Sequence, residues 1–314
     1  TIINTPFPQV WGMAGDETIF LGDGMFRSST LLSESYMQRA RYYLLAHEIG
    51  HLWSGIGAVT DFESENVFSE GLTEYITYDL FVEKFGDSGN LFPPDTYGLS
   101  EYFLTLFTEN ALISPSFTLS DAPHYSYQSM VKNNFDLPVM SSQEDRYLNS
   151  QTTLLYDKGV LLFNTLEDYV GKPNFQKALQ AYFKKPLSTD SNFKTFKRFI
   201  NKYATVSSEK ITAFFDTWFK SASYMDYSID KLYSGPTKNG SGYISRALLK
   251  KEGDGISNLD VKAVFQDGSS QTQTITDPKD LDVVSFKSDS PLDFFHLDPK
   301  NRLIETSKMN NLSK

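Results

Sequence analysis

The sequence of 314 residues contains no cysteine. This absence excludes disulfide bonds, a thiol nucleophile and every zinc or iron–sulfur site that is built from thiolates. Any metal ion must therefore be bound by histidine, aspartate or glutamate. The chain also lacks a run of 18 apolar residues, so the sequence predicts no membrane-spanning helix. The absence of cysteine is compatible with an exported protein, but it does not decide the compartment.

Basic residues are in the minority among the charged side chains. The chain has 29 lysines and arginines against 39 aspartates and glutamates, which gives a formal net charge of −10. A protein that binds nucleic acid needs a basic patch, so this balance argues against nucleic acid as the main partner. The rest of the composition, 40% hydrophobic and 15% aromatic, is typical of a globular protein.

Hydrophobic periodicity predicts that residues 1–228 are mostly helical. A short strand is expected at Glu17–Leu21, and a helix is expected over Glu70–Phe85, where the glycine that follows stops it. Prolines, serines and asparagines interrupt residues 87–150, which we interpret as an irregular insertion. One helical island is expected in it, near Ser100–Ala111.

From residue 229 to 314 the pattern changes to short runs of β-forming residues. The Asp267-Gly268 pair indicates a hairpin between two of them. We therefore predict an α+β protein with two domains. A mostly helical domain at residues 1–228 is followed by an all-β domain at residues 229–314.

The clearest chemical signal is the segment His47-Glu48-Ile49-Gly50-His51. On a helix, residues four apart lie on one face, so both imidazoles can reach one metal ion. Glu48 is turned about 100° away and can reach a water molecule beside that ion. The pattern indicates a zinc site with Glu48 as general base. The alternative is a buried helix that carries two incidental histidines.

A catalytic zinc ion takes three protein ligands and keeps one open position. Without cysteine, the third ligand should be a carboxylate or a histidine. Glu70 follows His51 after 18 intervening residues and opens the next expected helix, so a helical hairpin can return it to the ion. The alternative is a surface glutamate that the helix dipole favours at an N-terminus.

These motifs resemble those of the gluzincin zinc aminopeptidases, the family of membrane alanyl aminopeptidase and leukotriene hydrolase. His47-Glu48-x-x-His51 is followed by Trp53, and Glu70-Gly71 comes at the family's spacing. Tyr156-Asp157-Lys158-Gly159 is similar to the family's Tyr-x-Lys-Gly element. The resemblance implies that Tyr156 donates its hydroxyl to the oxyanion of the tetrahedral intermediate. The alternative is that Tyr156, one of 18 tyrosines, only packs.

The resemblance also implies a fold, in which a thermolysin-like catalytic domain precedes a small β-sandwich. The N-terminal β domain that precedes the catalytic domain in the family is missing from this sequence, so we expect the chain to be part of a longer polypeptide with further domains. The family's substrate-binding edge strand would fall at Trp11–Gly15. This assigns substrate binding to Gly12, Met13, Ala14 and Gly15.

The family's glutamate for the α-amino group of the substrate is replaced here by Ala14. Asp16 or Glu17 could substitute for it. The resemblance implies an aminopeptidase with one zinc ion per chain and a peptide substrate, but the missing glutamate leaves open an endopeptidase or another end specificity. A non-catalytic peptide-binding or scaffold domain is a third alternative. Glu74, one turn after Glu70, is either a partner of a ligating histidine or a solvated carboxylate.

Overall fold

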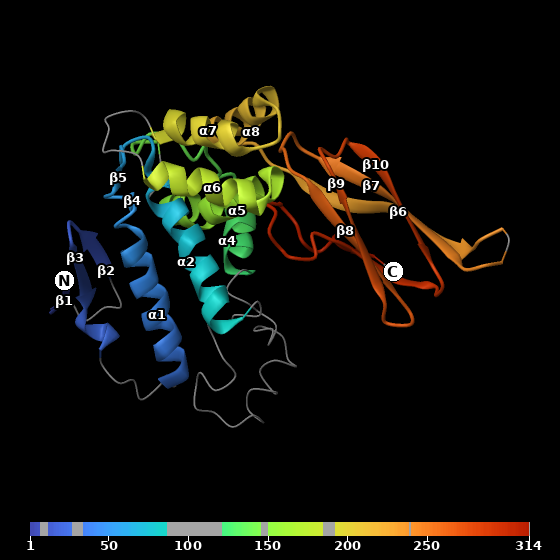
Figure 1. Ribbon diagram of the computed structural model, residues 1–314, viewed down its shortest axis with the longest axis horizontal. Coiled ribbons are helices and arrows are strands. Elements are labelled where there is room, and N and C mark those ends of the chain that lie inside the picture. The colour runs from blue at the N-terminus through green and yellow to red at the C-terminus, as the bar shows by residue number, and fades with distance from the viewer. Residues whose placement is uncertain are drawn as a thin grey trace.

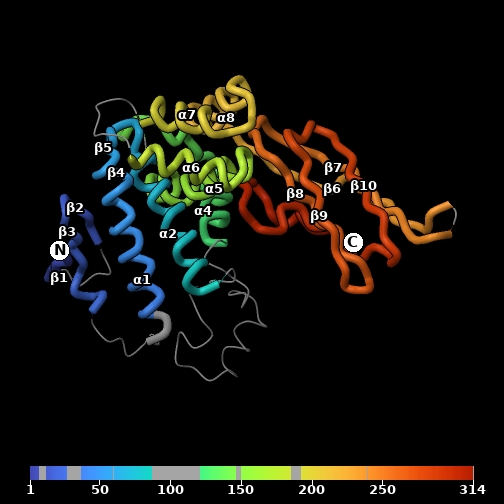
Figure 2. Tube along the Cα trace, viewed as in Figure 1, coloured from blue at the N-terminus to red at the C-terminus, as the bar shows by residue number. Residues whose placement is uncertain are grey.

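The fold is seen in a computed structural model of the chain (Figure 1). It describes residues 1–6, 12–26, 34–86, 121–145, 150–184, 192–238 and 240–313. Among them, no helix combines the length and the apolar character that crossing a membrane requires. The N-terminus lies on a small sheet beside α1, and the C-terminus lies in the β-rich part of the molecule (Figure 2).

The N-terminal sheet has three strands in the order β1-β3-β2. Strand β1 (Ile2–Thr5) runs parallel to the central strand β3 (Thr18–Gly22), and β2 (Gly12–Gly15) pairs antiparallel with β3 on its other side. The strand expected at Glu17–Leu21 is therefore present, shifted by one residue. Among the described strands, β2 lies at the edge of this sheet, and it contacts α1 (Figure 1).

Seven α-helices are described. They are α1 (Glu34–Gly50), α2 (Glu70–Phe85), α4 (Asp121–Lys132), α5 (Lys158–Val170), α6 (Lys172–Phe183), α7 (Asn192–Tyr203) and α8 (Ser208–Lys220). Helices α1 and α2 pack side by side, α5 crosses α2, and α7 and α8 form an outer layer (Figure 1). Helix α2 has the predicted bounds because Gly86, at φ +89°, ends it. Between α1 and α2 lie β4 (Ser54–Gly55), β5 (Ala58–Val59) and a short turn at Asn66–Phe68.

The prediction of irregular structure over residues 87–150 is wrong at α4, which is a regular helix. Pro123 lies in the first turn, where a helix tolerates proline because the amide hydrogen has no partner there. Buried residues on one face, among them Tyr127 and Met130, pack toward α5. The sequence does not predict this amphipathic helix because its segment contains proline and serine residues, which are typical of loops. The helical island expected at Ser100–Ala111 lies outside the described residues.

The C-terminal part is a sandwich of two sheets. Their strands are β6 (Asp226–Pro236), β7 (Tyr243–Glu252), β8 (Leu259–Phe265), β9 (Ser270–Ile275), β10 (Leu281–Ser288), β11 (Leu292–Leu297) and β12 (Leu312–Ser313). One sheet has the order β10-β7-β6 and the other β12-β11-β8-β9. The hairpin predicted at Asp267-Gly268 joins β8 to β9, and Gly268 has φ +82°. Alternate residues of β8 are buried, so this face forms the sandwich core. The predicted α+β fold is confirmed.

The segment after β11 returns to the helices. Arg302 Nε lies 2.9 Å from Asp168 on α5, and its Nη2 lies 2.8 Å from Glu167. The Asn301 amide donates to Asp121 at the start of α4 over 2.7 Å. These polar contacts join the β-rich part to the helical part. The division into two domains at residue 228 stays a prediction.

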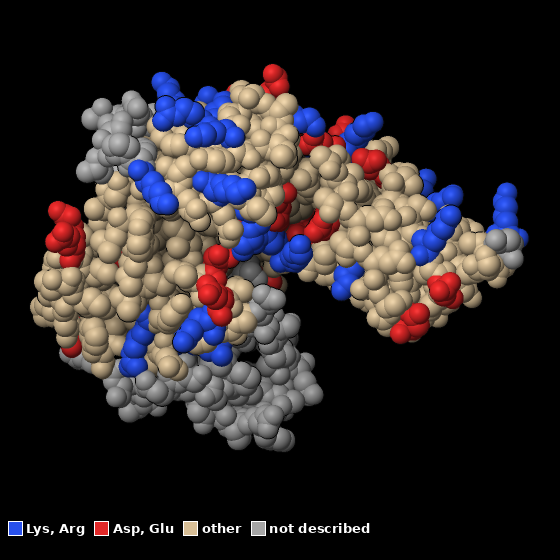
Figure 3. Space-filling model, viewed as in Figure 1, with Lys and Arg blue, Asp and Glu red and all other residues tan. Residues whose placement is uncertain are grey.

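The charged surface is uneven. Figure 3 shows lysine and arginine side chains gathered over α6, α7 and α8 on the side of the molecule that is turned to the viewer. Helix α7 alone carries Lys194, Lys197, Arg198 and Lys202, with no acidic residue. The net negative charge of the chain is therefore not spread evenly over the described surface.

Candidate metal centre

Helix α1 carries both histidines of the motif to one point. The Nε2 atoms of His47 and His51 lie 3.1 Å apart, and the two rings stand at 88° to each other. His51 directly follows the last residue of α1, one turn after His47. The two imidazoles therefore converge, as the spacing of four residues predicts.

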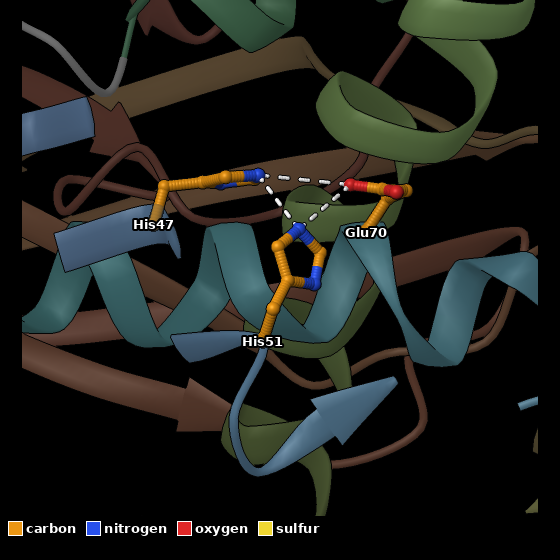
Figure 4. Close-up of side chains that lie close together, drawn as sticks. All are labelled: His47, His51 and Glu70. Atoms are coloured by element: carbon orange, nitrogen blue, oxygen red, sulfur yellow. Dashed lines mark hydrogen bonds and ion pairs between the residues drawn. The ribbon is translucent and has the colours of Figure 1, made fainter. Parts of the chain in front are cut away.

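Glu70 completes a triangle with the two histidines. It is the first residue of α2, and its Oε2 atom lies 3.6 Å from His47 Nε2 and 3.3 Å from His51 Nε2. Figure 4 shows the carboxylate and both rings pointing at one another. One ligand atom from each residue falls within 4.8 Å of the others. Among the described residues, this is the one such cluster of histidine and acidic side chains.

The electrostatics of the triangle are those of a site that attracts a cation. Burial alone would lower the pKa of His47, but hydrogen bonds to Glu70 and Glu74 outweigh it and raise the pKa to about 10. Burial alone would raise the pKa of Glu70, but the adjacent imidazoles of His47 and His51 and the Tyr156 hydroxyl lower it to about 2. Glu70 Oε2 is buried and faces both Nε2 atoms, but neither makes a well-aligned hydrogen bond to it. Two imidazoles and a carboxylate are a known ligand set for catalytic zinc, and these residues fit it.

The Nδ1 atoms of both histidines face oxygen atoms behind the triangle. His47 Nδ1 lies 3.2 Å from Glu74 Oε1, and His51 Nδ1 lies 3.1 Å from the carbonyl oxygen of Ser54. Such partners orient the rings and leave Nε2 for a metal ion. Glu74 is only 6% exposed, so it is not the solvated carboxylate of the alternative interpretation.

Glu48 lies on another face of α1, against strand β2. Its side chain is buried, and the backbone amide of Ala14 donates to its carboxylate. Burial raises the pKa of Glu48 above its ordinary value. Gly12 lies so close that a methyl group there would be 2.4 Å from Glu48 Oε1. No sequence pattern predicts this contact, because the two residues are 36 positions apart.

Tyr156 belongs to a π-helical turn, Thr153–Asp157, that leads into α5. Such turns often occur at functional sites because they change the direction of side chains. The Tyr156 ring stacks on His47 with centroids 5.7 Å apart and planes 13° apart, and its hydroxyl hydrogen-bonds to Glu70. Burial and the charge of Glu70 raise the pKa of Tyr156, so its hydroxyl remains a donor at neutral pH. The neighbouring Lys158 points elsewhere and forms a buried ion pair with Asp136 at 2.6 Å.

The predicted substrate-binding residues form strand β2. Met13 is 49% exposed, and Gly12, Ala14 and Gly15 are partly buried. Asp16 and Glu17 are exposed in the turn that joins β2 to β3. No described side chain of β2 carries a charge.

Comparison with known proteins supports a relationship across the helical part. The family model of the peptidase family M1 domain matches residues 12–218, about two thirds of the chain. Tricorn protease-interacting factor F2 of Thermoplasma volcanium is 22% identical over 199 residues, which are 63% of this chain and 22% of that protein. A solved structure of Legionella pneumophila aminopeptidase A in complex with aspartic acid has a TM-score of 0.61 at 12% identity, covering 97% of this chain and 31% of the other. The structural likeness shows the fold alone. The chain spans less than a third of either protein.

Proposed function

Because this chain belongs to peptidase family M1, we propose that it is a zinc-dependent peptidase that acts as an aminopeptidase. The observation that carries the proposal is the convergence of His47, His51 and Glu70, whose ligand atoms fall within 4.8 Å of one another. All three lie inside the matched range. They would hold one zinc ion per chain.

When bound, zinc lowers the pKa of a water ligand toward about 7 and polarises the carbonyl group of a substrate. Glu48 would take the proton of the attacking water and pass it to the leaving amine. Its raised pKa suits both steps, because a base is most effective when its pKa lies near the working pH. Tyr156 would donate its hydroxyl to the oxyanion, a charge that exists only in the transition state.

A peptide substrate would lie along the free edge of β2. The amide of Ile19 on β3 donates to the carbonyl of Thr1, so the hydrogen-bonding groups of Ile19 face β1. Ala14 is its partner across the ladder and therefore turns its own amide, which donates to Glu48, and its carbonyl to the free edge. An extended peptide can add to such an edge as a further strand.

The composition of β2 favours a second candidate function, a peptidase that does not require a free α-amino group. An exopeptidase must present a negatively charged group to the charged amine of the substrate. Without such a group, it binds the substrate less tightly and does not hold the scissile bond in position. Ala14 offers no charge, and Asp16 and Glu17 are exposed in the turn beyond it. This arrangement is compatible with an endopeptidase.

Three measurements separate these functions. Metal analysis of the purified chain should find about one zinc ion, which Glu70→Ala should lose. Glu48→Gln should keep the zinc and lose turnover. Peptides with free and with acetylated N-termini then distinguish an aminopeptidase, which cleaves only the former, from an endopeptidase. A wild-type chain that binds zinc and peptide without cleaving it would instead be a non-catalytic peptide-binding domain.

A further inference from the structure

A tyrosine lies behind the metal triangle. Tyr43 precedes His47 by one turn of α1, and its hydroxyl donates to Glu74 Oε2. The other oxygen of the same carboxylate, Oε1, lies 3.2 Å from His47 Nδ1. Glu74 therefore bridges the phenol and the imidazole, one oxygen to each.

We propose that Tyr43 is a positioning residue of the metal centre, which holds the Glu74 carboxylate in the orientation that aims His47 Nε2 at the ion. The inference rests on the proposed function, since it takes His47, His51 and Glu70 as the zinc site. In this role Tyr43 would act through Glu74 and would bind neither the ion nor the substrate.

The burial of Glu74 explains why a second donor is needed. The carboxylate side chain is only 8% exposed, so water can satisfy little of its hydrogen-bonding capacity. A buried carboxylate with one free oxygen is costly and tends to rotate toward another donor. Such a rotation would remove the acceptor from His47 Nδ1 and free the ring to turn.

The surroundings of Tyr43 keep its hydroxyl in place as a donor. The Tyr78 hydroxyl hydrogen-bonds to Tyr43, and the two rings meet edge to face with centroids 6.0 Å apart. Burial and the charge of Glu74 raise the pKa of Tyr43 well above its ordinary value, so the hydroxyl stays protonated. Asp157 is a further charged group that acts on both tyrosines.

The neighbouring Tyr42 provides a matched control. It lies on the same helix, and its ring packs on Phe81 and Phe85. Its hydroxyl donates to the backbone carbonyl of Leu80 over 3.3 Å, not to a partner of the metal ligands. Both substitutions remove one hydroxyl from a tyrosine of the same helix, but only the hydroxyl of Tyr43 is connected to His47.

The test measures zinc affinity of the 314-residue chain by competition with a chelator. Partners behind a metal ligand typically contribute 10–100-fold in affinity, so we expect Tyr43→Phe to weaken zinc binding about tenfold. Tyr42→Phe should bind zinc like the wild type. In a Glu74→Gln background, Tyr43→Phe should have little further effect because its route to His47 is already broken.

The outcomes separate this inference from the proposed function. A wild-type chain that binds no zinc would overturn both. Equal zinc affinities of the wild type and Tyr43→Phe would overturn the inference alone, as would an undiminished effect of Tyr43→Phe in the Glu74→Gln background. If Tyr43→Phe does not fold, Glu74→Gln by itself must weaken zinc binding at least tenfold. Its failure to do so would equally overturn the inference.

Discussion

Gly71 and Gly159 pack backbone against backbone where α2 crosses the start of α5. A methyl group on Gly159 would lie 2.7 Å from the Cα atom of Gly71, and one on Gly71 would lie 2.8 Å from the carbonyl oxygen of Leu155. Neither position has room for a side chain. The close approach brings Glu70 and Tyr156, each within three residues of its glycine, into hydrogen-bonding contact.

Replacing Gly159 by alanine tests this crossing. In an ordinary helix, Gly→Ala stabilises by about 1 kcal/mol. Here the methyl group must push α5 away from α2, so we expect a net loss of about 1–3 kcal/mol in the free energy of unfolding. Turnover should also fall, because Tyr156 moves away from Glu70. Urea unfolding and peptidase assays measure the two effects, and a stabilised variant would show that the helices are not in tight contact.

Strand β2 should control the position of Glu48. In Gly12→Ala the new methyl group would lie 2.4 Å from Glu48 Oε1, so the carboxylate must move. A displacement of about 1 Å can cost on the order of 100-fold in rate, and we expect kcat to fall by about that factor while zinc content stays constant. Thr18→Ala on the paired strand β3 controls for general disturbance of the sheet. Unchanged kcat in Gly12→Ala would contradict the close contact.

Zinc affinity should depend on pH through His47. The raised pKa of about 10 means that the metal-free imidazole holds a proton at neutral pH, which zinc must displace. Apparent affinity should therefore rise with pH, by up to about tenfold per unit below that pKa. Chelator competition between pH 6 and pH 8 measures the slope. A flat profile would mean that His47 is already neutral across this range.

Arg302 should hold the β-rich part against α5. Its guanidinium contacts Asp168 and the buried Glu167, and Arg302→Met leaves both carboxylates without this partner. Removing one partner of a fully buried pair costs about 3–5 kcal/mol; because Arg302 is 24% exposed, we expect a smaller loss of about 1–3 kcal/mol in the free energy of unfolding. Lys172→Met is the matched control, because the pair of Lys172 with Asp79 is half exposed and should contribute less than about 1 kcal/mol. Equal unfolding midpoints of the two variants would contradict the expected role of Arg302.

Local patterns predicted much of the site. The convergence of His47 and His51 depends only on helical geometry, and the start and end of α2 follow from Glu70 and Gly86. Helix α4 was missed because its proline resembles a helix breaker when the buried face is not visible. Tyr43 could have been noticed, since it lies four residues before His47 and hence on the same helix face.

The sequence by itself determined most of the elements and the chemistry that they offer: two imidazoles on one helix, a carboxylate or a histidine as the third candidate ligand of a chain without cysteine, and an α+β order of elements. Only the tertiary structure decided which distant groups meet. It placed Tyr156 on His47, Gly12 against Glu48, and the carboxylate of Glu74 between Tyr43 and His47. The physical reason is that periodicity reports on neighbours within a few residues, whereas these contacts arise when separate elements pack together and exclude water.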